Sequence, residues 1–170
     1  MKKIVTLIII GLAIIVGVSA YLNRGNIEAK KESQDNATIS FKSNGSEVAK
    51  KDMNFVKTLA KSSFSANLKA NGKKAVKHTY TGVPLKKVFE ALNIKLDGKS
   101  QVIVTAADGY ATVLTIDEVN VDDNVYLAYE MDGKPLGTKK DGGSGPFEVI
   151  IKNDSFSQRW CKFVSEVELK

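Results

Sequence analysis

The sequence predicts an α+β domain built mostly from antiparallel strands, with two or three short helices. Four dipeptides of the kind that tolerates positive φ in tight hairpin turns recur along the chain: Asn44-Gly45, Asn71-Gly72, Asp108-Gly109 and Asp132-Gly133. Segments with the alternating or β-branched pattern of strands lie around them: 39–43, 64–69, 75–80, 101–106, 110–116, 125–131, 146–152 and 162–169. No regular alternation of strands with helices runs through the chain, which argues against a doubly wound parallel sheet.

The chain begins with a candidate membrane segment. Lys2 and Lys3 precede an apolar run over residues 4–22, and a helix of that length measures about 28 Å, close to the thickness of a bilayer core. The positive N-terminus predicts a cytoplasmic start and an exported remainder. Two alternatives stay open: an uncleaved anchor, or a secretory signal cleaved after Ala20, because Val18-Ser19-Ala20 fits a signal-peptidase site.

The rest of the chain divides into a tether and one domain. Residues 23–36 are polar and without period, as expected of a tether, and residues 37–170 form the predicted domain. Without Lys2 and Lys3 the exported part carries 23 basic and 19 acidic side chains, so its net charge is +4 against +6 for the whole chain. Such a mild balance suits an anionic surface or a small anion. It lacks the clustered Arg that nucleic-acid binding needs, so we exclude nucleic acid as a partner.

Two stretches have helical periodicity. Residues 84–93 place four apolar side chains on one face, and Pro84 suits a first turn because its missing N–H would have no partner there. Residues 52–61 form a second amphipathic stretch that Asp52 can cap. A further turn of helix is expected at residues 116–119.

Residue types that carry catalysis are sparse. His78 is the only histidine, and no Ser or Cys nucleophile with a supporting acid stands at a recognisable spacing from it. Cys161 is the only cysteine, which excludes an internal disulfide, and its phase with Phe163 and Val167 points it into the core. One His and one Cys cannot build a closed zinc or copper site. The residues therefore predict no catalytic group and no metal site.

The glycine-rich stretch 141–146 is a candidate anion contact. Its three glycines would let backbone N–H groups converge on an anion, and Lys139 and Lys140 precede it. The alternative is a flexible connection into the next strand. Arg159 is a second candidate, because its planar fork suits phosphate.

Four segments in order carry a resemblance to a known family: YTGVPLKKVFEAL, VIVTAADGYATVLTIDEV, VYLAYEMDGKPL and GGSGPFEVIIKNDSFSQRWCKFVSEVEL. Together they resemble the molybdopterin-binding domain of the sulfite oxidase family, over about residues 37–170. The resemblance implies a compact α+β fold, largely antiparallel, in which a cleft lined by loops holds the pyranopterin and its phosphate.

The resemblance also implies cofactor-binding positions. Ser157 and Arg159 match the segment that contacts the cofactor phosphate. The other implied positions lie beside the helix entry or border the same opening: His78, Tyr80, Asp108, Tyr110 and Gly143. Residues 81–84, Thr-Gly-Val-Pro, are then the turn into the cofactor-side helix, with Gly82 permitting a tight loop.

One departure concerns the metal. The resemblance implies a molybdenum-ligating cysteine in a Cys-x-Gly-Asn-like loop, and Ala70 stands about where that cysteine is expected. A methyl group cannot coordinate a metal, and Asn71-Gly72 predicts an ordinary hairpin turn between the neighbouring strands. The expected cofactor is therefore molybdopterin or a related pterin without molybdenum.

These observations predict a membrane-tethered, extracytoplasmic module without molybdenum catalysis. It would bind a pterin, another small anion or a protein partner such as a redox protein. The alternative is an active molybdopterin-dependent oxidoreductase or a subunit of one. A third possibility is an exported interaction module with no small ligand, because a fold does not dictate a function.

Overall fold

The computed structural model describes residues 9–19, 21, 34–69, 72 and 74–170, and the chain divides into two units, Met1–Ser33 and Gln34–Lys170. Residues 9–19 of the first unit are helical. Within the described residues, no helix is long and apolar enough to cross a membrane. The predicted membrane segment includes residues 4–8, 20 and 22, which lie outside the described part together with most of the tether, so both stay predictions.

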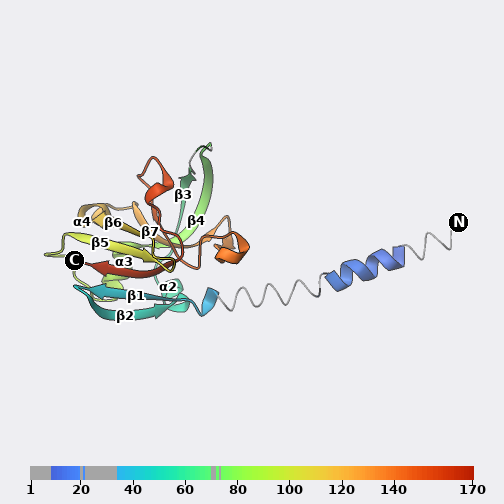
Figure 1. The fold of residues 1–170 in the computed structure, drawn as a ribbon, viewed down its shortest axis with the longest axis horizontal. Coiled ribbons are helices and arrows are strands. Elements are labelled where there is room, and N and C mark those ends of the chain that lie inside the picture. Colours follow the sequence, from blue (N-terminus) through green and yellow to red (C-terminus); the bar gives the residue numbers. More distant parts are fainter. Residues whose placement is uncertain (1–8, 20, 22–33, 70–71, 73) are drawn as a thin grey trace. The chain divides into compact units, whose positions relative to one another are not determined.

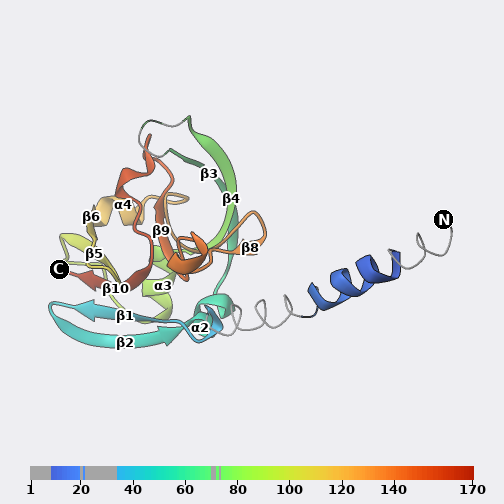
Figure 2. The same ribbon diagram turned by 45° about the vertical axis from the view of Figure 1, so that its right-hand side comes forward.

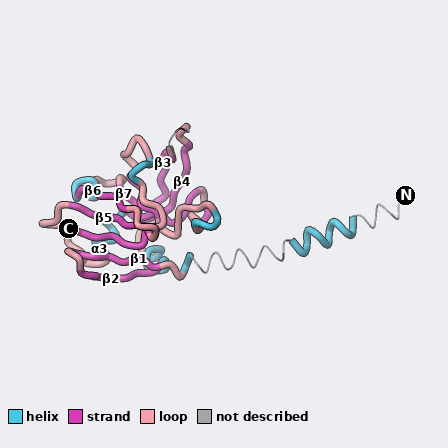
Figure 3. Tube along the Cα trace, in the orientation of Figure 1, coloured by secondary structure: helices cyan, strands magenta, loops and turns pink. Residues whose placement is uncertain are grey.

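The second unit contains two sheets (Figures 1 and 3). The first has the strand order β2-β1-β10-β5-β6. Its strands are β1 (Thr38–Ser43), β2 (Ser46–Asp52), β5 (Gln101–Ala106), β6 (Ala111–Thr115) and β10 (Val164–Leu169). All neighbours are antiparallel except β1 and β10, which run parallel. The C-terminal strand, β10, is therefore the middle strand of this sheet and lies between β1 and β5.

The second sheet has the order β3-β4-β7-β8, with β9 also pairing with β7, and every pair is antiparallel. Its strands are β3 (Ser62–Leu68), β4 (Val76–Pro84), β7 (Val125–Met131), β8 (Lys134–Pro135) and β9 (Glu148–Ile151). Figure 2 shows β3 and β4 as a long curved hairpin that extends beyond the rest of the domain. The prediction of an α+β fold with mostly antiparallel strands is confirmed.

Three short α-helices lie in the described part of the second unit: α2 (Met53–Thr58), α3 (Leu85–Ala91) and α4 (Ile116–Asn120). Asp52 caps α2, as predicted, by accepting a hydrogen bond from the Phe55 N–H at 2.8 Å. Thr115 and Glu118 form a reciprocal capping box at the start of α4. Helix α3 begins directly after Pro84, which ends β4.

The predicted turns fix several hairpins. Asn44-Gly45 joins β1 to β2 and Asp132-Gly133 joins β7 to β8, and all four residues have the positive φ that such two-residue turns require. Residues 70, 71 and 73 lie outside the described part, so the tight turn at Asn71-Gly72 and the position of Ala70 stay predictions.

The expectation for Gly82 was wrong. Gly82 lies inside β4, at an irregularity between Thr81 and Gly82, rather than in a loop. A Cβ at this position would lie 2.6 Å from the Leu127 oxygen and 2.7 Å from the Ala128 Cα. Glycine is therefore needed because the backbone of β7 approaches so closely.

The core fills the space between the sheets and α3. The Phe41 ring of β1 meets the Phe89 ring of α3 edge to face, with centroids 6.4 Å apart. Aromatic rings continue this packing on the second sheet, where Tyr80 stacks on Phe64 and meets Trp160 edge to face at 5.9 Å. Gln34, the first residue of the unit, is fastened to β7, since its side-chain amide donates to the Tyr129 carbonyl at 3.0 Å.

Candidate functional site

The glycine-rich segment turns its N–H groups inward. The N–H groups of Gly143, Ser144 and Gly145 donate to the carbonyls of Thr138, Leu136 and Gly137, at 2.9 to 3.1 Å. A Cβ on Gly143 would lie 2.2 Å from the Leu136 oxygen. The glycines therefore allow two backbone segments to pack against each other. In this conformation their N–H groups do not converge on an anion, contrary to the first of the two interpretations.

Arg159 is held by carboxylates. It lies in a short 3-10 helix, η2 (Ser157–Arg159), and its Nε and Nη2 donate to the two Asp154 oxygens at 2.9 and 2.6 Å. Nη2 also donates to Glu118 of α4 at 2.7 Å. The hydrogen bond from the Arg159 side chain is the largest of the causes that lower the pKa of Glu118. Arg159 therefore braces η2 against α4, and an anionic ligand would have to compete with both carboxylates.

Ser157 and Tyr110 brace the same segment from other sides. The Ser157 hydroxyl donates to the Lys69 carbonyl at 2.9 Å and accepts from the Lys69 N–H at 3.1 Å. The Tyr110 hydroxyl donates to the Gln158 carbonyl at 3.0 Å. Both predicted ligand contacts thus tie η2 to neighbouring backbone, at the end of β3 and the start of β6.

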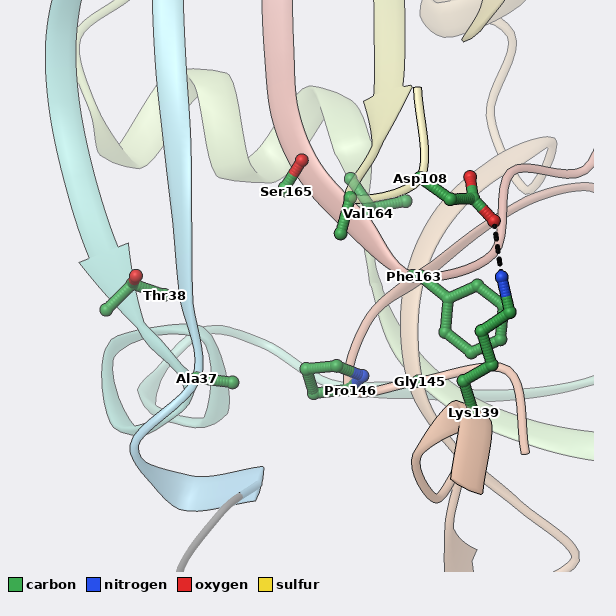
Figure 4. A pocket seen from close by; sticks show the side chains of 10 residues that line it. Ala37, Thr38, Asp108, Lys139, Gly145, Pro146, Phe163, Val164 and Ser165 are labelled. Atoms are coloured by element: carbon green, nitrogen blue, oxygen red, sulfur yellow. Dashed lines mark hydrogen bonds and ion pairs between the residues drawn. The ribbon is translucent and has the colours of Figure 1, made fainter. Parts of the chain in front are cut away.

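Asp108 borders a groove of about 410 Å³ (Figure 4). Its carboxylate accepts a hydrogen bond from Lys139 at 3.2 Å, and this partner lowers the pKa of Asp108 most strongly. The Lys139 ammonium also lies 5.7 Å from the centre of the Phe163 ring. The groove is lined by Ala37, Thr38, Ala107, Asp108, Lys139, Gly145, Pro146, Phe163, Val164 and Ser165. Most of this lining is apolar, and its two charged residues, Asp108 and Lys139, form an ion pair with each other.

His78 lies on β4 with its Nδ1 2.7 Å from Asp132 Oδ2. The other Asp132 oxygen accepts from the Thr79 N–H at 3.0 Å. Asp132 is the first residue of the β7–β8 turn, so this contact fastens that turn to β4.

Tyr80 and Gly143 share a different hollow, a cavity of about 100 Å³. It is lined by Leu68, Tyr80, Met131, Gly142, Gly143, Ser144, Glu148 and Lys162. Of the seven predicted positions, these two line a common cavity, whereas Arg159, Ser157 and Tyr110 meet at η2. Asp108 and His78 lie in contacts of their own.

Sequence reasoning missed Glu148. This residue is 1% exposed on β9, all four residues of which are buried. The Ser144 hydroxyl donates to its Oε2 at 2.6 Å, and burial raises its pKa from 4.5 to about 7. A signal was available, since Glu148 is the one charge inside the apolar run PFEVII.

Cys161 lies in the core. It is 0% exposed and bridges to Val149 through two backbone hydrogen bonds of 2.8 and 3.0 Å. Burial is the main cause that raises the pKa of its thiol to about 12. Among the described residues, no group of three His, Cys, Asp or Glu side chains could hold a metal ion.

The comparisons with known proteins define the class. Residues 26–170 match the oxidoreductase molybdopterin binding domain family, so the chain belongs to that family. No curated protein matches the sequence.

Among solved structures, the chain is similar to the sulfane dehydrogenase SoxCD from Paracoccus pantotrophus. The TM-score is 0.65 at 13% sequence identity, over 80% of this chain and 38% of that one. This likeness establishes a shared fold, and the chain spans less than half the length of the SoxCD chain.

Proposed function

We propose that this chain is a non-redox member of its family, a binding module that holds no molybdenum. The observation that carries the proposal is the position of Cys161, the only cysteine in the sequence. A thiolate ligand must be deprotonated and must reach the metal. The Cys161 thiol is fully buried, its pKa is about 12, and its Sγ lies 3.8 Å from the Val104 carbonyl.

The remaining candidate contacts also fit a molybdopterin poorly. The cofactor's phosphate needs free donors, yet Arg159 is committed to Asp154 and Glu118. The glycine-segment N–H groups donate to backbone carbonyls. Arg159 and the glycine-rich segment thus make contacts that stabilise the fold, and we derive no reaction step from them.

We further propose that the module works on the outer side of the cytoplasmic membrane. The support is the sequence of the N-terminus, where two lysines precede the apolar run 4–22 and a polar stretch follows it. Mass spectrometry of the native N-terminus, together with fractionation of the source cells, tests this part. An intact Met1 in the membrane fraction supports an anchor, and a terminus at Tyr21 in the soluble fraction supports a secreted form.

Metal and pterin analysis of protein purified from its own source tests the loss of molybdenum. We expect molybdenum well below stoichiometric and no change in metal content in Cys161→Ala. Stoichiometric molybdenum that disappears in Cys161→Ala, with the variant still folded, would overturn the proposal. Acid oxidation in the same experiment reports any pterin by its fluorescence. A pterin without molybdenum would define a pterin-binding module. The groove beside Asp108, with about 410 Å³, lies in the size range of ligand clefts, roughly 300 to 1,000 Å³.

The second candidate is an oxidoreductase, or a subunit of one, with unusual ligation of the metal. The observation in its favour is the fold shared with SoxCD, whose name describes a dehydrogenase. Under this candidate, molybdenum is present at stoichiometric level and survives Cys161→Ala, because the ligand is not this thiol.

A further inference from the structure

Glu148 has one carboxylate oxygen without a partner. Its Oε2 accepts from Ser144, but Oε1 is buried and makes no hydrogen bond within the described part of the chain. Glu148 itself is 1% exposed. Buried polar atoms in folded proteins are nearly always hydrogen-bonded, and a buried carboxylate oxygen without a donor is costly. The unpaired oxygen therefore indicates a place for a donor.

Glu148 is one of the residues that line the cavity of about 100 Å³ described above. This volume is about three times the roughly 30 Å³ that one molecule takes up in liquid water, and it lies well below the roughly 300 Å³ of the smallest ordinary ligand clefts. Exposed residues at its edge, Gly142 and Lys162, connect it with solvent. The cavity therefore has room for a charged head group with a short alkyl chain.

The walls suit an organic cation better than a metal ion. Leu68 and Met131 supply apolar contacts, and the Tyr80 ring supplies an aromatic surface. A divalent metal needs several oxygen ligands, and the described residues contain no cluster of three carboxylate, His or Cys side chains. One carboxylate among apolar and aromatic walls matches one ammonium group on a short alkyl chain.

No cation of the described residues pairs with Glu148 Oε1. Lys162 lines the cavity and its charge lowers the pKa of Glu148, against the larger opposite effect of burial. Yet Lys162 forms no ion pair with Glu148 in the structure described for residues 34–170. The Tyr80 hydroxyl and the Cys161 thiol also feel the Glu148 charge: burial is the main cause that raises their pKa values, and this charge adds to it.

We propose that this cavity binds a small primary alkylammonium ion, with an ammonium N–H donating to Glu148 Oε1 and the alkyl chain packed against Leu68, Met131 and the Tyr80 ring. Because the cation favours ionised Glu148, its affinity rises as the pH rises through about 7. This site stands on Glu148 and its cavity, and it does not depend on whether the chain holds molybdenum.

Ethylammonium chloride is the probe, with the full-length protein in detergent and methyl NMR of its labelled methionines. Met131 lines the cavity, while Met53 is the buried first residue of α2 and serves as an internal control. We expect a saturable shift of the Met131 methyl signal that an equal concentration of sodium chloride does not produce. Its apparent dissociation constant should fall between pH 6 and pH 8.

Glu148→Gln is the matched variant, because it keeps the shape of the side chain and removes its charge. We expect at least about tenfold weaker binding, the loss that one charge-assisted hydrogen bond implies, with the Met53 signal unchanged. No saturable shift in the wild type, a shift that sodium chloride reproduces, or equal affinity in Glu148→Gln would each overturn the proposal. The first of these outcomes means that water alone hydrates Oε1.

Lys162→Gln provides a second test should Glu148→Gln fail to fold. Lys162 is exposed, so the exchange is mild for the fold and removes the positive charge that opposes entry of a cation. We expect severalfold tighter binding of ethylammonium. Unchanged or weaker binding would contradict the proposed site, and the molybdenum analysis of the wild type would be unaffected by either result.

Discussion

Arg159 donates a hydrogen bond from its guanidinium to the carboxylate of Glu118 at 2.7 Å, and this contact fastens η2 to α4. The same guanidinium holds both oxygens of Asp154. In a cofactor-binding role this arginine would face a ligand. Here two carboxylates of the chain itself accept hydrogen bonds from its Nε and Nη2. The one to Glu118 connects two segments whose contacting residues are 41 positions apart in the sequence.

Arg159→Ala should therefore lower stability rather than remove a ligand. We expect a loss of about 1 to 2 kcal/mol, because the variant leaves Asp154 without its donors although the Arg159 side chain itself is 42% exposed. Denaturant unfolding measures the loss. As a matched control, Lys87→Ala breaks an exposed pair with Glu90 and should change stability by less than about 0.5 kcal/mol.

The same variant should also change how the stability of the fold depends on pH. The pKa of Glu118 is lower in the folded chain than in the unfolded chain, with Arg159 as the largest cause. Its stabilising effect is thus present above the unfolded pKa and is lost as the pH falls through the folded one. Arg159→Ala should lose less stability on acidification than the wild type, and an equal loss in both would contradict the assignment.

Cys161 should be inert in the native state. Its thiol is 0% exposed with a pKa of about 12, so a thiol reagent at pH 8 meets neither an accessible sulfur nor a thiolate. We expect less than one tenth of the thiol to react before unfolding and full reaction in denaturant. Rapid stoichiometric labelling of the folded protein would place the sulfur at the surface and would also undermine the proposed loss of metal binding.

Two adjacent glycines, Gly142 and Gly143, are needed for different reasons, the first for its backbone conformation and the second for close packing. Gly143 has no positive φ, yet its missing Cβ leaves room for the Leu136 carbonyl. Gly142 has φ of 71°, with nothing within 4 Å of an added Cβ. Gly142→Ala should cost about 1 kcal/mol, whereas Gly143→Ala should cost more than about 3 kcal/mol because backbone must move. Thermal unfolding of both variants measures the difference, and similar costs would contradict the close contact.

The sequence predicts the secondary structure well where neighbouring residues alone determine it. Alternation of apolar residues predicted β5, β7 and β10, and the turn dipeptides predicted the hairpins β1–β2, β5–β6 and β7–β8. The strand β2 was not predicted because its run SEVAKKD is mostly exposed and charged. It is a strand because it pairs with β1 at the edge of the sheet, and that partner is known only once the chain has folded.

The candidate site was harder to predict for a similar reason. Arg159, Ser157 and His78 were predicted as cofactor contacts, but a sequence does not show which groups of its own chain these side chains meet. Lys69 and Asp132 reach Ser157 and His78 through tertiary contacts. Glu148 shows the opposite case, since a charge in an apolar strand already predicts an unusual environment.

The buried carboxylate of Glu148 gives the last prediction, a stability that falls as the pH rises. Its pKa is raised by burial from 4.5 to about 7, so between these values the unfolded chain releases a proton that the folded chain retains. Unfolding then becomes easier with rising pH, and the effect is complete above about pH 7. This difference in pKa between the unfolded and the folded chain corresponds to about 3 kcal/mol in the free energy of unfolding.

Urea unfolding of the wild type and Glu148→Gln between pH 5 and pH 8 measures this effect. The wild type should lose stability over this range relative to the variant, because Gln does not ionise and has no such pH dependence. The matched control is Glu90→Gln, an exposed residue of α3, whose pH profile should follow that of the wild type. If the wild type and Glu148→Gln lose stability in parallel, Glu148 is already ionised at pH 5 in the folded protein, and a donor must then pair with its Oε1.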